Sequence, residues 1–128
     1  MTDAIDRTAH VTAAAVAIVD DHEAVRLGLR AACEAAGYSV VADTADVAQL
    51  LAVLDGRRCD VVVLDLSLGD GISVTENVRS VLATGSAVLV HSIADRVAAV
   101  RESLAAGAAG VIPKASPMSD VILSLIHI

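Results

Sequence analysis

The chain has 128 residues, a length that predicts one domain. Its 9 basic and 16 acidic residues give a formal net charge of −7, which argues against direct binding to nucleic acid or to an anionic membrane. Hydrophobic residues make up 55% of the chain, so we expect a packed core. That core must be aliphatic, because the chain has 25 alanines and neither Phe nor Trp.

The sequence also indicates a compartment. The longest apolar runs are shorter than the roughly 20 residues that a membrane span needs, and the N-terminus MTDAIDRTAH lacks the basic and apolar regions of a signal peptide. Two cysteines, Cys33 and Cys59, are too few for a disulfide framework. We therefore expect a cytoplasmic protein with reduced thiols and no membrane contact.

Short aliphatic runs alternate along the chain with segments of helical periodicity. We predict strands at 15–20, 38–42, 59–66, 87–92 and 110–114. Apolar residues at the three- and four-residue spacings of helices mark 25–36, 47–54, 74–82, 97–104 and 121–126. Strand–helix units joined by right-handed crossovers form a parallel sheet with helices on both faces, so the expected fold class is α/β, doubly wound.

Polar residues follow four of the predicted strands, at the edge where open parallel sheets bind ligands. Asp20 and Asp21 end the first strand, Asp65 the third, Ser92 the fourth and Lys114 the fifth. Carboxylates so close together repel one another unless a cation intervenes, and such oxygens beside a phosphate suit Mg²⁺. Lys114, the only lysine beside 8 arginines, adds a positive charge for an anion. The pattern predicts a site for a phosphoryl group and Mg²⁺.

Other polar residues have simpler interpretations. His22 has no second His or Cys at ligand spacing, so we interpret it as a helix-start residue. His91 lies on the strand face opposite Ser92 and is interpreted as structural. Asp43 and Asp46 are interpreted as the cap and the first-turn acid of the helix after the second strand.

Four ordered segments resemble the successive signatures of the receiver domain of two-component response regulators. They are VAIVDDHEAVRLGL, DVVVLDLSLGDG, AVLVHS and GAAGVIPKASP, and the similarity runs from about residue 15 to about residue 122. The opening DDH-x-x-V-R-x-G-L resembles the NarL/LuxR-type subgroup, whose members carry a C-terminal helix-turn-helix. The resemblance implies a flavodoxin-like (βα)5 fold with strand order 2-1-3-4-5.

The resemblance also implies a role for each acidic residue. Asp65 would be the phosphoacceptor, taking a phosphoryl group from a histidine kinase or a small phosphodonor. Asp21 would bind Mg²⁺ directly and Asp20 mainly through water, with the backbone carbonyl of Ser67 as a further ligand. Phosphorylation and dephosphorylation of Asp65 would be the only chemistry, so the chain is not expected to be an enzyme acting on other molecules.

The resemblance implies that Lys114 and Ser92 bind the phosphoryl group. Lys114 would pair with a phosphoryl oxygen, and Ser92 would move in to hydrogen-bond the group. Val111 stands where the family has an aromatic switch residue, which leaves the form of the output open. The expected partners are a histidine kinase, a second copy on phosphorylation, and DNA only through an absent C-terminal domain.

The ends of the chain are expected to differ from the receiver domain at 14–122. Residues 1–13 are polar and irregular, which predicts a flexible segment. Residues 123–128 read LSLIHI, the peptide that a transposon-end adapter from DNA library preparation encodes in this frame. We therefore expect a C-terminally truncated chain whose non-native tail completes the last helix. The alternative is a native helix end, which has the same apolar spacing.

Three other functions compete with a receiver that controls transcription. A stand-alone receiver acting as a phosphate shuttle has the same motifs. A haloacid-dehalogenase-type phosphatase also uses an aspartate nucleophile and Mg²⁺, but it needs a second Asp two residues later, where Ser67 stands. A dinucleotide-binding domain needs a glycine-rich turn after the first strand, where this chain has Asp20, Asp21 and His22.

Overall fold

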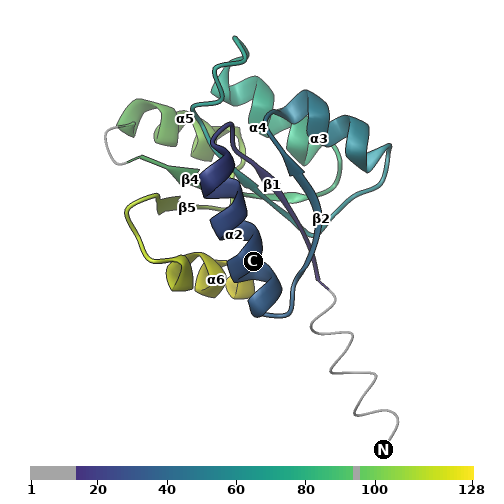
Figure 1. Cartoon of the computed structure of the whole chain (residues 1–128). Helices are drawn as coiled ribbons and strands as arrows, with labels where there is room; N and C mark the ends of the chain where they lie inside the picture. Colours follow the sequence, from purple (N-terminus) through teal and green to yellow (C-terminus); the bar gives the residue numbers. More distant parts are fainter. Residues whose placement is uncertain (1–13, 94–95) are drawn as a thin grey trace, which may run out of the picture.

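The computed structural model describes residues 14–93 and 96–128, in which parallel strands alternate with helices. The strands are β1 (Ala15–Val19), β2 (Ser39–Thr44), β3 (Val61–Leu64), β4 (Ala87–Ser92) and β5 (Gly110–Pro113). The helices are α2 (Glu23–Ala35), α3 (Val47–Leu54), α4 (Val74–Leu82), α5 (Val97–Ala106) and α6 (Met118–His127). The strand order β2-β1-β3-β4-β5 confirms the expected flavodoxin-like topology (Figure 1).

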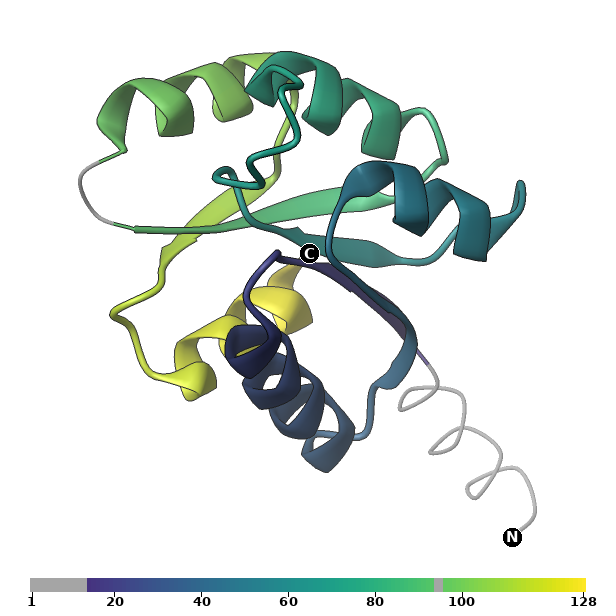
Figure 2. The same ribbon diagram turned by 45° about the horizontal axis from the view of Figure 1, so that its top comes forward.

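Helices cover both faces of the sheet. α3, α4 and α5 lie on one face, and α2 and α6 lie on the other (Figures 1 and 2). The chain first adds β2 on one side of β1 and then builds β3, β4 and β5 on the other side. This reversal between β1 and β3 opens a crevice at the carboxyl ends of the two strands, where ligands bind in folds of this class.

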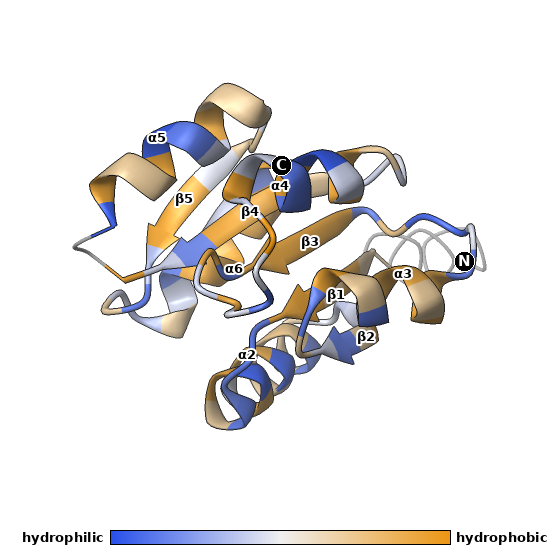
Figure 3. Cartoon of the chain, turned by 90° about the horizontal axis from the view of Figure 1, so that it is seen from above, coloured by the Kyte–Doolittle hydropathy of each residue, from blue (hydrophilic) through white to orange (hydrophobic). Residues whose placement is uncertain are grey.

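Aliphatic side chains bury the sheet from both sides. Successive residues of β1 point to opposite faces, so Ala17 and Val19 pack with α3 and α4, whereas Val16 and Ile18 pack with α2 and α6. Every residue of β3 is buried, as expected for a central parallel strand. Figure 3 shows β1 and β3 in the orange of hydrophobic residues. The two clusters hold the strand ends in fixed register.

Side-chain caps mark the starts of α3 and α4. Asp46 accepts a hydrogen bond from the backbone N–H of Gln49 at 2.8 Å, and Ser73 accepts one from Glu76 at 3.1 Å. The interpretation of Asp43 as the helix cap is therefore wrong. Asp43 lies in β2, and the cap of α3 is Asp46.

Four elements, α2, β2, α5 and α6, extend beyond their predicted ranges. β2 runs on to Thr44, which is buried and whose hydroxyl donates to the carbonyl of Asp46 at 3.2 Å. α6 continues to His127, and Leu125 is buried on its inner side. None of the helices within the described residues is long and apolar enough to span a membrane.

We expect Leu50→Ala to lower the free energy of unfolding by about 2–5 kcal/mol, because this fully buried side chain leaves a cavity when it is truncated. Leu51→Ala is the matched control, since Leu51 on the same helix is 39% exposed and should lose less than about 1 kcal/mol. Urea unfolding followed by circular dichroism measures both values. Equal losses would contradict the assignment of the inner face of α3.

Candidate functional site

Strand register brings two acidic residues together at the carboxyl edge of the sheet. Val19 of β1 pairs with Leu64 of β3, so the residues that follow, Asp20 and Asp65, are neighbours. The backbone N–H of Asp65 donates to the carbonyl of Val19 at 2.9 Å. Asp20 is 1% exposed and Asp65 is 2% exposed. The fold thus places two carboxylates side by side and removes both from water.

Lys114 supplies a positive charge between these carboxylates. Its Nζ lies 2.9 Å from Asp20 Oδ2 and 3.3 Å from Asp65 Oδ1. The backbone N–H of Lys114 donates to the carbonyl of Ser92 at 2.7 Å, which fixes the residue beyond the end of β5. Ile112 faces α2 and α6, and strand alternation turns Lys114, two residues later, to the same side of the sheet.

The electrostatics of the site follow from burial and from these contacts. Burial raises the pKa of the Asp65 carboxyl above its ordinary value, and the Asp20 carboxylate raises it further. The Ser67 N–H, which donates to Asp65 Oδ1 at 3.2 Å, and the Lys114 ammonium both lower the pKa of Asp65 in part. Burial lowers the pKa of Lys114, but the two carboxylates outweigh it and leave that pKa raised. Lys114 therefore stays protonated at neutral pH.

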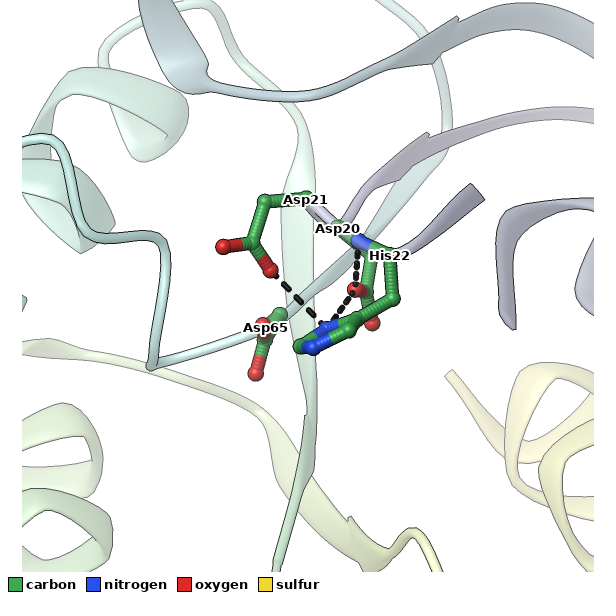
Figure 4. A group of neighbouring side chains, drawn as sticks. All are labelled: Asp20, Asp21, His22 and Asp65. Carbon is green, nitrogen blue, oxygen red and sulfur yellow. Dashed lines mark hydrogen bonds and ion pairs between the residues drawn. The ribbon is translucent and has the colours of Figure 1, made fainter. Parts of the chain in front are cut away.

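Asp21 and His22 complete the group at the start of α2. The Asp21 side chain is 36% exposed, and its Oδ1 lies 3.0 Å from Nδ1 of His22. The same Nδ1 lies 3.2 Å from Asp20 Oδ1. Figure 4 shows Asp20, Asp21, His22 and Asp65 gathered at one place. One candidate ligand atom from each lies within 4.8 Å of the others.

Arg26 is a structural residue of the site that the sequence analysis missed. Its Nη1 donates to the backbone carbonyl of Asp20 at 2.7 Å, and its Nε lies 2.8 Å from Asp43 Oδ1. The guanidinium thereby ties the first turn of α2 to the ends of β1 and β2. The available signal was Asp43 itself, an acidic residue near the end of the strand next to β1.

The loop after β3 curls over the exposed part of the site. Leu66 and Leu68 are buried and anchor the loop to the core. Gly69 has a φ of 66°, and a Cβ built on it would lie 4.0 Å from Asp21 Oδ2. A left-handed residue at this point turns the loop back toward Asp21, and glycine adopts that conformation without strain.

Ser92 lies at the same edge but apart from the charged group. Alternation along β4 puts Ser92 on the face opposite His91, and its Oγ donates to the carbonyl of Ile93 at 3.3 Å. Among the described residues, its hydroxyl makes no hydrogen bond to Asp65 or Lys114. Ser92 and Val111 instead border a mostly apolar groove of about 350 Å³ beside α5.

The donor set of the site fits a hard divalent cation. Three carboxylates from Asp20, Asp21 and Asp65 converge on it. Asp65 Oδ2 is buried and has no hydrogen-bond partner in the described part of the chain. A buried carboxylate oxygen left in this way is costly unless a ligand satisfies it. Carboxylate oxygens are the protein ligands that Mg²⁺ takes, usually together with water and phosphate.

Comparison with known proteins identifies relatives of the chain. Residues 16–126 match the family described as the response regulator receiver domain. The chain is 37% identical over 117 residues to the transcriptional regulatory protein UhpA of Salmonella typhimurium. That alignment covers 88% of this chain and 56% of UhpA, so the chain spans about half the length of the curated relatives it matches.

Solved structures give the same picture. The chain is similar to a two-component response regulator of the LuxR family from Aurantimonas sp., with a TM-score of 0.78 and 29% identity over 90% of this chain and 84% of that one. The isolated REC domain of RcsB from Salmonella enterica, solved with the phosphomimetic BeF3⁻, has a TM-score of 0.77 at 23% identity over 89% of this chain and 86% of that one. The second likeness shows the fold alone.

We expect Asp65→Asn to raise the free energy of unfolding at neutral pH by on the order of 1 kcal/mol. The pKa of Asp65 is raised in the folded chain, so its contribution to stability is present below the ordinary aspartate pKa and is lost as the pH rises through the folded value. The gain from the amide should therefore shrink toward acid pH. Urea unfolding of both proteins across this pH range measures it.

Asp21→Asn is the matched control, because it removes the same charge from a side chain that is 36% exposed. It should change the unfolding free energy less than Asp65→Asn does. An Asp65→Asn protein that is less stable than the wild type at neutral pH would contradict the assigned direction of the Asp65 pKa.

Proposed function

The chain belongs to the family of response regulator receiver domains, and we propose that it accepts a phosphoryl group on Asp65 from the phosphohistidine of a histidine kinase. The observation that carries this proposal is the pairing of Asp65 Oδ1 with Lys114 Nζ at 3.3 Å, while Asp65 Oδ2 has no hydrogen-bond partner within the described chain. One oxygen is held beside a cation and the other is left to react. Nucleophile and charge partner thus stand in one place.

The proposed transfer makes one bond and breaks one. Asp65 Oδ2 attacks phosphorus, the P–N bond to the donor imidazole breaks, and the imidazole leaves with the electron pair of that bond. It is neutral when its other nitrogen carries a proton. The product is an acyl phosphate, a mixed anhydride that water hydrolyses back to the carboxylate. Asp65 would thus hold a transient signal, and external phosphoesters would not be turned over.

The charge of the transferred group needs positive partners, because catalysis of phosphoryl transfer consists mainly of positioning and charge stabilisation. Lys114 would pair with a phosphoryl oxygen, since it already lies between Asp20 and Asp65. Asp20, Asp21, Asp65 and the backbone carbonyl of Ser67 would hold Mg²⁺, which supplies further positive charge to the phosphoryl oxygens when it is bound.

Ser92 would sense the phosphoryl group from the neighbouring strand. Its Oγ is buried and bonded only weakly, at 3.3 Å to the carbonyl of Ile93, so a phosphoryl oxygen offers a stronger acceptor. Val111 borders the same groove. A valine fills less space there than an aromatic side chain, and the movement of Ser92 would be transmitted by the end of β4.

The output of the domain would be control of transcription through a DNA-binding domain joined to its C-terminal side. UhpA is a transcriptional regulatory protein, and this chain covers 56% of it. The net charge of −7 on this chain favours contact with DNA through another domain. Exposed apolar side chains on α5, Val97 at 57% and Leu104 at 47%, support pairing with a second copy on phosphorylation.

Incubation of the purified chain with acetyl phosphate and Mg²⁺ should add one phosphoryl group per molecule, measured by intact-mass spectrometry. Asp65→Asn should add none, because an amide is not a nucleophile for this reaction. EDTA should abolish the adduct on the wild type.

Asp70→Asn is the control for the loss of a nearby carboxylate. Asp70 lies in the loop after β3 and accepts a hydrogen bond from the N–H of Ile72, so this variant should be phosphorylated like the wild type. An adduct that persists in Asp65→Asn, or its absence from a folded wild-type chain, would refute the proposal.

Lys114→Met should slow formation of the adduct by on the order of tenfold to a hundredfold, since it removes the positive charge beside the phosphoryl oxygens. The rate is followed by quenched time points and normalised to the folded fraction from circular dichroism. Arg79→Gln removes a positive charge from an exposed position of α4 and should leave the rate unchanged. A Lys114→Met protein that reacts as fast as Arg79→Gln would exclude Lys114 from the transfer.

A further inference from the structure

His22 brings a nitrogen atom to the carboxylates. Its Nδ1 lies 3.0 Å from Asp21 Oδ1 and 3.2 Å from Asp20 Oδ1 (Figure 4). Neighbouring ligands of an octahedral ion with bonds of about 2.1 Å are about 3.0 Å apart. The imidazole therefore stands at the distance of a further ligand from both carboxylates. Asp65 is 2% exposed, and one of its carboxylate oxygens belongs to the same group. Its buried Oδ2 has no hydrogen-bond partner among the described residues.

We propose that His22 is a ligand of the metal site and gives the site a preference for divalent transition ions such as Co²⁺ over Mg²⁺. The inference rests on the proposed function, because the same carboxylates would hold the metal there. It adds a residue to the site and names the class of ion that this residue selects.

The preference follows from the chemistry of the ligand atoms. Mg²⁺ takes oxygen ligands and keeps several waters, so a nearby imidazole adds little to its binding. Later first-row divalent ions bind nitrogen ligands well, and their affinity rises from Mn²⁺ through Co²⁺ to Ni²⁺. Exchange of one water for the imidazole of His22 thus strengthens the binding of Co²⁺ and leaves that of Mg²⁺ nearly as it was.

The start of α2 does not depend on the ring of His22. His22 is the N-cap residue of α2, with φ −94° and ψ 110°, yet its side chain makes no capping hydrogen bond. Its backbone N–H donates to Asp20 Oδ1 at 2.8 Å, a contact that does not need the ring. The side chain is 64% exposed. A substitution by alanine therefore removes the imidazole without removing a helix contact.

The alternative to a metal ligand is a cation that competes with the metal, and it predicts the opposite change in metal affinity. A protonated His22 would form ion pairs with Asp20 and Asp21 and would act as their cation. The imidazolium would then compete with every divalent ion, and its removal would tighten the binding of Mg²⁺ and Co²⁺ alike. The sign of the change on substitution separates the two arrangements.

The experiment uses the whole chain without a histidine tag at about pH 8, above the ordinary pKa of an imidazole. Isothermal titration calorimetry with CoCl2 and with MgCl2 gives the two dissociation constants. His22→Ala should raise the Kd for Co²⁺ about tenfold or more, since mutation of residues that only hydrogen-bond to metal ligands already lowers metal affinity by about that factor. The Kd for Mg²⁺ should stay within about twofold. His22→Asn should behave in the same way and retains a preferred helix-cap residue.

A spectroscopic signature tests the bond itself. Proton NMR of the Co²⁺-loaded chain should show a strongly shifted, exchangeable imidazole N–H signal that is lost in His22→Ala. His127→Ala is the matched control, because His127 is exposed at the end of α6. It should retain the signal and both dissociation constants.

Each other outcome overturns the inference. An unchanged Kd for Co²⁺ in His22→Ala, or a shifted imidazole signal that persists in it, removes His22 from the ligand set. Tighter binding of both ions makes His22 a competing cation. If Mg²⁺ binds and supports phosphorylation of Asp65 in these cases, the proposed function stands and only the inference fails. A wild-type chain that binds neither ion defeats both.

Discussion

The ammonium of Lys114 between the buried carboxylates of Asp20 and Asp65 is the interaction on which the site depends. Two buried carboxylates side by side cannot both stay ionised without a nearby cation, because each loses its hydration and the two charges repel one another. Lys114, which follows β5, offsets this unfavourable free energy by forming ion pairs with Asp20 and Asp65, which follow β1 and β3. The parallel register of three strands and the pairing of their terminal charges therefore stabilise one another, and the site is part of the sheet.

The sheet was predictable because its signal is local and strong. The run from Val61 to Leu64 is apolar at every position, and such a strand must be covered on both faces. Parallel strands then bring their carboxyl ends to one edge, so residues separated widely in the chain become neighbours without any knowledge of side-chain packing. Asp20, Asp65 and Lys114 meet because their strands end at this edge and because strand alternation turns all three to the same face of the sheet.

The side-chain contacts at the strand ends could not be predicted, because they depend on how each side chain is oriented in the folded structure. Aspartate is a residue type typical of loops, yet Asp43 lies in β2. Arg26 and Arg30 of α2 form ion pairs with its carboxylate, which balances its charge there. The role of Arg26 arises from that pairing, which no spacing in the sequence reveals. His22 follows the same pattern. One histidine in the sequence is no metal motif, and its contact with Asp21 at 3.0 Å appears only in the structure.

Counting charges explains how such a site can act as a switch. Three carboxylates and one ammonium carry a net charge of −2, which one divalent cation balances. An acyl phosphate on Asp65 would replace a charge of −1 by about −2 at neutral pH, which leaves about one unit of negative charge unbalanced.

Hydrogen-bond donors from outside the group would then be needed to stabilise the added negative charge. Ser92 is the hydroxyl at the same edge, on the opposite face of β4. In the proposed switch, Ser92 would reach the phosphoryl group only if the end of β4 moved toward the site. That movement would change the groove of about 350 Å³ that Ser92 and Val111 border. The proposed switch would thereby couple charge at the acidic edge to the shape of the surface beside α5.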